Sequence, residues 1–411
     1  MSKTQWQAPK RPDWLQKLND EGNLLDLINV VPLDESSLLN AACSATGLNN
    51  FGDERWREPF QTLIRSLEDD AELNMMGRLM ARNDILIWLK NRLQITELIK
   101  KHPEILQEKI EAPMFIVGLP RSGTSILFEL LWQDPDVGVP LLWEAMIPCP
   151  PPEAASYNSD PRIDYVHGIV TQWERVVPEY ATMHKMGGSL PAECGLIMAN
   201  TFLSDHCASL QQATSYGMYY AQSDLTHVYE YHKLILQILQ WKNPRKRWLL
   251  KAPEHQNNLQ TLLKIYPDAR IVQTHRDPIK SMASATSLLG ALYWMRSDKD
   301  FDASAFEDII MGEATAKRLE AVIDQRQSGA VPEANIADSR YQDLMDDPIS
   351  CIHGIYSHFN IELSEQAAEN MQNYLAQKPK GKHGKHDYSV DTSDRALFAR
   401  YQEYYNVPSE V

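Results

Sequence analysis

The sequence has few cysteines, no long apolar run and no excess of basic residues, and each shortage excludes a class of protein. The five cysteines are scattered along 411 residues without metal-ligand spacing or a disulfide framework, which favours a cytoplasmic protein with reduced thiols. No apolar run reaches the roughly 18 residues of a membrane span, so no transmembrane segment is expected. The N-terminus also lacks the apolar region of a signal peptide or transit peptide.

The charge balance excludes a general nucleic-acid binder. The chain carries 40 Lys and Arg against 55 Asp and Glu, a formal net charge of −15, whereas binding to a phosphate backbone relies on an excess of cations. A small anion can still bind where positive charge is local. Three places supply such charge: Arg121, residues 242–251 and residues 378–385.

The most informative segment is residues 115–125, FIVGLPRSGTS. A β-prone run leads into a loop from Gly118 to Ser125, and an apolar helical pattern follows at once. Strand, Gly-bounded loop and helix in this order are typical of a phosphate cradle. The spacing matches the G-x-x-x-x-G-K-[ST] pattern except that Thr124 stands in place of Lys. Such a loop suits ATP with Mg²⁺ poorly and a less charged phosphate better, with Arg121 as a planar donor.

Alternating strand and helix patterns predict the fold. Strands are expected at residues 112–118, 247–250 and 270–274, each followed by a helical pattern. This alternation implies a parallel sheet between helices, a three-layer α/β/α fold related to that of the P-loop nucleotide hydrolases. Ligands of such sheets bind at the carboxyl ends of the strands. The cations at those three ends are Arg121, Lys251 and Arg276.

The remainder of the chain is expected to be mainly helical. Residues 1–110 are predicted to form a helical N-terminal extension without a catalytic constellation, with helices around residues 12–18, 36–45 and 72–106. Residues 111–390 are the predicted α/β domain, with a mainly helical insertion at 139–245 on the acceptor side and a C-terminal tail at 391–411. The many aromatic residues of the insertion fit either a helical core or a pocket.

A second constellation joins Arg276 to Ser284. Arg276 closes a strand, and Asp277 and Pro278 are a good N-cap and first residue for a helix. Ser284 lies eight residues after Arg276, which is about 2.2 helical turns and places it near the same side of the helix start. Both residues could donate to one anion; the alternative is a capping Arg and a solvated Ser.

Three blocks in order carry a family resemblance: GLPRSGTS (118–125), LLKAPEH (249–255) and RIVQTHRDPIKSMAS (270–284). They resemble the sulfotransferases that use 3′-phosphoadenosine 5′-phosphosulfate (PAPS), and most of all the bacterial branch of that superfamily. The match extends to SRYQDLMDDP (339–348) and KPKGKHGKHDYS (378–389), so it covers roughly residues 113–390.

The resemblance implies roles for individual residues. The loop would cradle the 5′-phosphosulfate through Arg121, Ser122, Gly123, Thr124 and Ser125. Arg276 and Ser284 would bind the 3′-phosphate, and Tyr341 would lie near the adenine. A basic loop would close over the 3′-phosphate, with its register left open among Lys380, Gly381, Lys382, His383 and Lys385.

The implied reaction is an in-line displacement at sulfur, in which negative charge grows on the bridging oxygen of the departing nucleotide. Fixed cations beside that oxygen stabilise the transition state more than the ground state. Arg121 and Lys251 could both supply this charge, and the resemblance assigns that role to Lys251. No metal is required.

The acceptor hydroxyl also needs a base, for which three candidates remain. Glu144 is the first choice, because one branch of the superfamily, the protein-tyrosine type, places its catalytic Glu nearby, allowing a two-residue length difference. His184 and Glu193 are the rivals. Small-molecule sulfotransferases carry their base His where this chain has Pro253.

The sequence therefore predicts a cytoplasmic sulfotransferase that moves a sulfuryl group from PAPS to a hydroxyl of a small or lipid-like molecule. One alternative is a nucleotide kinase with a degenerate loop, which would turn over ATP with Mg²⁺. Another is a non-catalytic adenine-nucleotide binder, which would bind the product nucleotide PAP (3′-phosphoadenosine 5′-phosphate) without transfer. The acceptor and the oligomeric state stay open, a homo-oligomer included.

Overall fold

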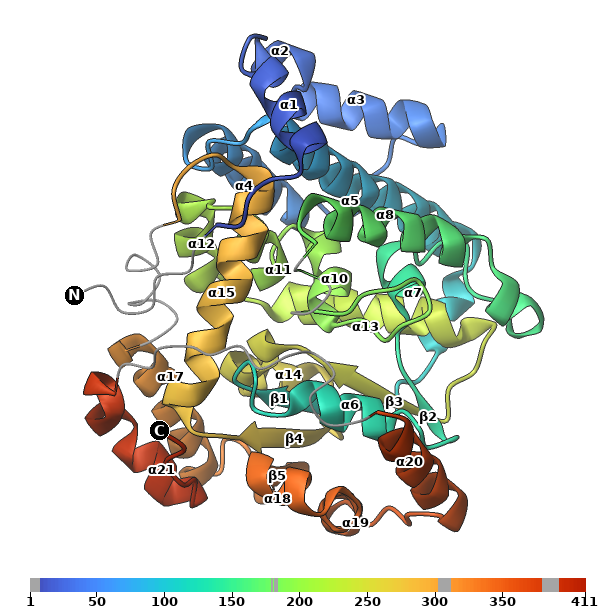
Figure 1. Cartoon of the computed structure of the whole chain (residues 1–411). Helices are drawn as coiled ribbons and strands as arrows, with labels where there is room; N and C mark the ends of the chain where they lie inside the picture. The colour runs from blue at the N-terminus through green and yellow to red at the C-terminus, as the bar shows by residue number, and fades with distance from the viewer. Residues whose placement is uncertain (1–7, 179, 181–183, 302–311, 379–391) are drawn as a thin grey trace.

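A parallel five-stranded sheet forms the centre of the protein in the computed structural model, which describes residues 8–178, 180, 184–301, 312–378 and 392–411 (Figure 1). The strand order across the sheet is β2-β3-β1-β4-β5, and every neighbouring pair is parallel. The strands are β1 (Met114–Gly118), β2 (Val137–Gly138), β3 (Arg247–Lys251), β4 (Arg270–His275) and β5 (Ile336–Arg340). This arrangement confirms the predicted α/β fold with a central parallel sheet.

The register of the central strands brings the predicted strand ends together. β1 lies between β3 and β4, with Ile116 opposite Lys251 and Gly118 opposite Thr274. All five residues of β1 are buried, as expected for a strand covered on both faces. The loop after β1, the end of β3 and the end of β4 therefore meet at one edge of the sheet.

Sequence patterns identified the three central strands and missed the two outer ones. β2 has only two residues, too few for a pattern, and pairs with the start of β3 through Val137 and Arg247. β5, with the sequence IADSR, places polar residues in the strand, including Asp338. Edge strands are exposed on one side, so they lack the continuous apolar run of the central strands.

Helices enclose this sheet and extend the core. In the α/β part they are α6 (Thr124–Leu131), α14 (Leu259–Ile265), α15 (Pro278–Arg296), α17 (Gly312–Gln327), α18 (Tyr341–Asp346), α19 (Pro348–His358), α20 (Glu365–Gln377) and α21 (Ala399–Tyr405). The largest buried cluster joins the strands to α6, α14 and α19 through Leu127, Leu262 and Ile355, among others. The predicted N-cap of α15 is confirmed, since the Asp277 carboxylate accepts a bond from the Ile279 N–H.

The N-terminal helices are α1 (Asp13–Gly22), α2 (Leu27–Val30), α3 (Glu35–Thr46), α4 (Arg57–Asp69) and α5 (Met75–Lys101). Sequence patterns missed α4, which holds Pro59 in its first turn, where proline is tolerated. A second buried cluster unites these helices with α15, through residues such as Leu89 and Met295. A Cβ added at Gly77 of α5 would lie 1.8 Å from the carbonyl oxygen of Arg296, so only glycine permits this close approach of α5 to α15.

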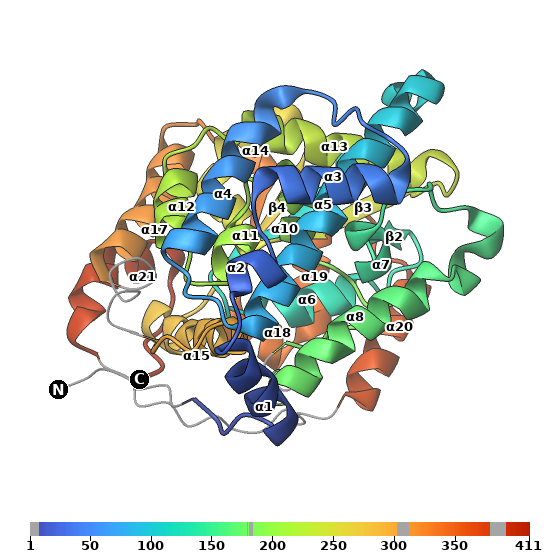
Figure 2. The ribbon, with the colours of Figure 1, turned by 90° about the horizontal axis from the view of Figure 1, so that it is seen from above.

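The region between β2 and β3 is helical, as expected. Its helices are α7 (Leu142–Met146), α8 (Arg162–Val176), α10 (Cys194–Met198), α11 (Asp205–Ser209), α12 (Thr214–Ala221) and α13 (Thr226–Trp241). The helix expected at 161–177 is α8, whereas 191–241 is broken into several helices. Seen from above, α8 runs beside α5 (Figure 2). Within the described ranges, no helix has the length and apolarity that a membrane crossing needs.

Candidate active site

Contacts of the Ser122 side chain connect the loop after β1 to β4. The Ser122 hydroxyl lies 2.6 Å from the Leu119 carbonyl oxygen and 2.6 Å from Thr274 Oγ1. A Cβ on Gly118 would lie 2.1 Å from that same Thr274 oxygen, and Gly118 has a φ of +147°, so the strand-to-loop turn requires glycine. The Ser122 hydroxyl therefore holds the loop in place and is directed at β4.

The loop continues past Ser122 into α6. Gly123 has a φ of +97° and precedes α6, whose first N–H groups have no carbonyl one turn earlier and add positive potential. Arg121 also has a positive φ, +66°, a conformation that is costly for a residue with a Cβ, and its side chain is exposed. Thr124 is buried, whereas Ser125 is exposed.

Lys251 lies beside the first turn of α6. Its side chain, at the end of β3, is only 7% exposed, and its Nζ donates to Glu193 Oε1 at 2.7 Å and to Ser125 Oγ at 3.3 Å. The ammonium also lies 5.7 Å from the centroid of the Phe128 ring. The structure thus brings Lys251 to the phosphate loop, as the strand-end pattern predicted.

His184 and Glu193 lie beside Lys251. The His184 Nε2 is 4.0 Å from Glu193 Oε1, and the two side chains are 39% and 30% exposed. Burial alone raises the pKa of Glu193, but the positive charges of Lys251 and His184 outweigh it, and the pKa is lowered. The pKa of His184 is lowered by burial and by the charges of Lys251 and Arg121, which the Glu193 carboxylate only partly offsets. The imidazole is therefore neutral at neutral pH.

Glu144 has a different environment from these two candidates. Its side chain is 0% exposed, and its Oε1 accepts from Arg245 Nη2 at 2.6 Å. Its Oε2 accepts from the Leu141 N–H at 2.9 Å and from the Tyr157 hydroxyl at 2.7 Å. A general base must reach the proton that it removes. These contacts make Glu144 a buried cap of α7 and argue against its predicted role as the base.

Arg276 and Tyr341 meet on the other side of the loop. The guanidinium carbon of Arg276 lies 3.8 Å from the centroid of the Tyr341 ring, and Nη1 donates to the Arg121 carbonyl at 3.0 Å. A Cβ on Gly123 would lie 3.1 Å from the Tyr341 ring. The predicted 3′-phosphate and adenine residues thus flank the loop.

One partner of Arg276 was not anticipated. Glu410 accepts from Arg276 Nε at 2.8 Å and from Nη2 at 2.7 Å. The backbone of Ser284 belongs to α15, but its side chain lies outside the description. Lys380, Gly381, Lys382, His383 and Lys385 also lie outside the described residues.

A buried acidic pair behind Lys251 was also missed. The Glu254 carboxylate accepts from the Tyr220 hydroxyl at 2.9 Å and from the Asp205 N–H at 3.0 Å. Burial raises the pKa of Glu254, and burial together with the Glu254 charge raises the pKa of Asp205 well above its usual value. Glu254 follows Lys251 by three residues, which is the only hint that the sequence offers.

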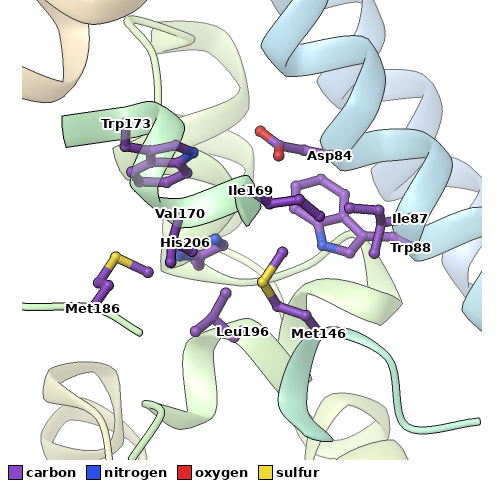
Figure 3. A pocket seen from close by; sticks show the side chains of 10 residues that line it. All are labelled: Asp84, Ile87, Trp88, Met146, Ile169, Val170, Trp173, Met186, Leu196 and His206. Carbon is purple, nitrogen blue, oxygen red and sulfur yellow. The ribbon is translucent and has the colours of Figure 1, made fainter. Parts of the chain in front are cut away.

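An apolar pocket lies among α5, α8 and α10 (Figure 3). Its cavity volume is about 20 Å³, which is room for about one water molecule. Met186, two residues after His184, and Leu196 of α10 are among its lining residues. Trp88 of α5 and Trp173 of α8 supply its aromatic walls. The sequence left a pocket within the 139–245 insertion open as an alternative to a helical core, but it did not predict the part that α5 takes in the pocket.

The pocket has one buried ion pair in its wall. The Asp84 carboxylate lies between the rings of Trp88 and Trp173 in Figure 3 and is 2.7 Å from Arg296 Nη2. Burial raises the pKa of Asp84, although the Arg296 charge opposes the shift. The Arg296 guanidinium also lies 5.4 Å from the Trp173 ring centroid. Among the described residues, no group of three or more His, Cys, Asp or Glu side chains is placed to hold a metal ion.

Comparisons with solved structures give the same architecture. The sulfotransferase STF1 from Mycobacterium tuberculosis H37Rv superposes with a TM-score of 0.74 at 28% identity, covering 90% of this chain and 98% of that one. The sulfotransferase STF9 from Mycobacterium avium superposes with a TM-score of 0.76 at 25% identity, covering 92% and 97%.

Sequence comparisons agree with the structural ones. The omega-hydroxy-beta-dihydromenaquinone-9 sulfotransferase Stf3 of Mycobacterium bovis is 24% identical over 301 residues, which is 70% of this chain and 72% of that protein. The Stf3 of Mycobacterium tuberculosis matches equally. A family model described as the sulfotransferase family matches residues 113–365. The span holds the phosphate loop, Lys251, Arg276 and Tyr341, and the chain belongs to the sulfotransferase family.

Proposed function

We propose that this sulfotransferase takes its sulfuryl group from PAPS and transfers it to a hydroxyl of an apolar, lipid-like molecule. The observation that carries the proposal is the convergence of Lys251, Arg276 and Tyr341 on one phosphate loop. The nucleotide would lie across the loop, with its 5′-phosphosulfate between Arg121 and Lys251. Its 3′-phosphate would lie at Arg276 and its adenine near Tyr341.

Lys251 is the group best placed to stabilise the leaving phosphate. The attacking hydroxyl oxygen forms a bond to sulfur while the bond from sulfur to the bridging oxygen breaks, and PAP departs with the electron pair. An ammonium has three donors, and Lys251 directs two of them to Glu193 and Ser125. The third donor is available for the bridging oxygen, where the negative charge grows.

His184 is our candidate for the base, with Glu193 as its partner. A base works best when its pKa lies near the working pH. The pKa of Glu193 is lowered from an already acidic value, whereas the imidazole of His184 is neutral and can accept the proton of the hydroxyl at Nε2. The Glu193 carboxylate, 4.0 Å away, would then stabilise the imidazolium that forms.

The apolar pocket supports the acceptor class. Its walls are mostly aromatic and aliphatic, and one of its lining residues, Met186, follows His184 by two residues in the chain. The related Stf3 proteins are named for a menaquinone derivative, which is a lipid-like alcohol. An apolar chain or ring would enter only if the lining side chains moved apart, because the pocket has room for about one water molecule.

A thermal-shift screen tests the nucleotide. We expect PAP to raise the unfolding temperature without metal, because a ligand that binds only the folded state stabilises it. Stabilisation by ATP with Mg²⁺ alone would overturn the proposal and favour a kinase. Transfer of labelled sulfur from PAPS to a series of primary alcohols, such as 1-dodecanol and ethanol, then separates an enzyme from a non-catalytic binder.

The assignment of the base has its own test. His184→Asn should lower kcat by about 100-fold and leave the Kd for PAP unchanged by calorimetry. His353→Asn, which changes an exposed histidine of α19, is the matched control. Wild-type kcat in His184→Asn would remove His184 from the mechanism, and Glu193→Gln would then be the variant to measure.

A further inference from the structure

The guanidinium of Arg276 is already engaged by a carboxylate of the same chain. Glu410 spans Arg276 Nε and Nη2 with two bonds of 2.8 and 2.7 Å, which is the fork geometry that arginine also offers to phosphate. The remaining nitrogen, Nη1, donates to the Arg121 carbonyl. Arg276 is 15% exposed and Glu410 29% exposed at the side chain, so the pair is partly shielded from water.

The segment that carries Glu410 is docked by several contacts. The Glu410 N–H donates to Asp277 Oδ2 at 2.8 Å. Arg395 donates to the same Asp277 oxygen at 3.2 Å and to the Val411 carbonyl at 2.7 Å. It also donates to Ser409 Oγ at 2.7 Å. Asp277 is the N-cap of α15 and directly follows Arg276, so the segment is held at the very end of β4.

These contacts place one anion where the proposed function requires another. A single edge of a guanidinium can hold one bidentate anion, so a 3′-phosphate and the Glu410 carboxylate compete for Arg276. The ring of Tyr341 lies 3.8 Å from the guanidinium carbon and packs against Arg276. Glu410 therefore takes the two Arg276 donors that a bidentate 3′-phosphate would use.

We propose that Glu410 is a displaceable counter-ion of Arg276, a positioning residue that holds the guanidinium over Tyr341 in the free enzyme and leaves when a 3′-phosphate arrives. This inference rests on the proposed binding of PAPS at Arg276. Displacement costs part of the binding energy of every nucleotide that has a 3′-phosphate. Return of Glu410 to Arg276 assists departure of PAP after transfer.

The proposal predicts different effects on nucleotides with and without a 3′-phosphate. PAP and PAPS must break the contact between Arg276 and Glu410, whereas ADP has no 3′-phosphate and leaves it intact. Removing the carboxylate should therefore tighten PAP and leave ADP unchanged. A substitution at a residue that only supports the fold would change the Kd values for PAP and ADP equally.

Calorimetry with PAP and ADP on the full chain tests this difference. In Glu410→Gln we expect the Kd for PAP to fall by about tenfold, the scale of one charge-assisted pair, and the Kd for ADP to stay unchanged. Glu410→Asp keeps the charge and should bind PAP more like the wild type. Glu403→Gln removes an equal charge from an exposed position of α21 and should change neither constant.

A variant of Arg276 distinguishes an error in the counter-ion proposal from an error in the proposed 3′-phosphate site. In Arg276→Gln, PAP should bind more weakly, and adding Glu410→Gln should have no further effect. If Arg276→Gln weakens PAP but Glu410→Gln does not tighten it, the counter-ion proposal is wrong and the nucleotide assignment stands. If Arg276→Gln leaves PAP unchanged, the proposed 3′-phosphate site itself is wrong. Equal tightening of PAP and ADP in Glu410→Gln would also refute the proposal.

Discussion

Replacing Lys251 with methionine tests the charge at the centre of the proposed reaction. Methionine keeps the length and the apolar stem of lysine and removes only the ammonium. The Lys251 side chain is 7% exposed, so solvent cannot replace the charge that is lost. The Nζ has partners at 2.7 and 3.3 Å, which sets the distance expected for a third partner, the bridging oxygen.

The expected magnitude follows from that distance. At about 3 Å and an effective dielectric constant of about 20, two unit charges interact with about 5.5 kcal/mol. If about half a charge develops on the bridging oxygen, the transition state gains about 2.7 kcal/mol, equivalent to a factor of about 100 in rate. Lys251→Met should therefore lower kcat by about 100-fold, with a smaller effect on the Kd for PAP.

The assay is transfer of labelled sulfur from PAPS to the alcohol that the wild type uses best, together with calorimetry of PAP binding. Lys264→Met, which changes an exposed lysine of α14, is the matched control and should keep wild-type values. A loss of kcat below tenfold would refute a transition-state role for Lys251. If PAP affinity falls as much as kcat, Lys251 stabilises the bound nucleotide and the transition state equally.

Three further outcomes follow from the structure. Glu144→Gln should lower the unfolding temperature, because it leaves the partly buried Arg245 unpaired at a cost of about 3 kcal/mol; unchanged stability would contradict the cap role. Gly77→Ala should also destabilise the fold, by about 1–3 kcal/mol in urea unfolding, because its Cβ would overlap the Arg296 carbonyl; a neutral result would show that α5 can move. Burial lowers the pKa of His232 to about 3 and that of His255 well below its usual value. Since the unfolded chain takes up these protons below about pH 6.5, the free energy of unfolding should fall as pH drops from 6.5 towards 4, and His232→Asn should reduce the fall.

The parts of the site that lie next to one strand were predictable from the sequence. The loop after β1, Lys251 after β3 and Arg276 after β4 each follow an apolar run, and the parallel register then brings them together. Sequence patterns did not predict β2, because its two residues are too few to form a pattern. Short-range patterns describe elements that are buried along their whole length and miss those that are not.

The base and the counter-ion depend on contacts between distant segments. Whether Glu144 or Glu193 faces Lys251 is decided by how residues 139–193 fold back on the sheet, and their spacing in the sequence does not show this. Arg276 and Glu410 are 134 residues apart, and no motif joins them. The predicted domain boundaries stay a prediction, but the second buried cluster joins α5 to α15 across them.

The close approach of α5 to α15 affects whether the N-terminal helices can be removed from the protein. α15 starts one residue after Asp277 and ends at Arg296, so a single 19-residue helix reaches from the end of β4 to the Arg296–Asp84 ion pair in the pocket wall. A shortened protein starting near residue 111 would leave Met295 and its neighbours in water and strip one wall from the pocket. Helices α1, α3, α4 and α5 thus share a buried cluster with α15, and we expect a protein shortened to residue 111 to lose stability.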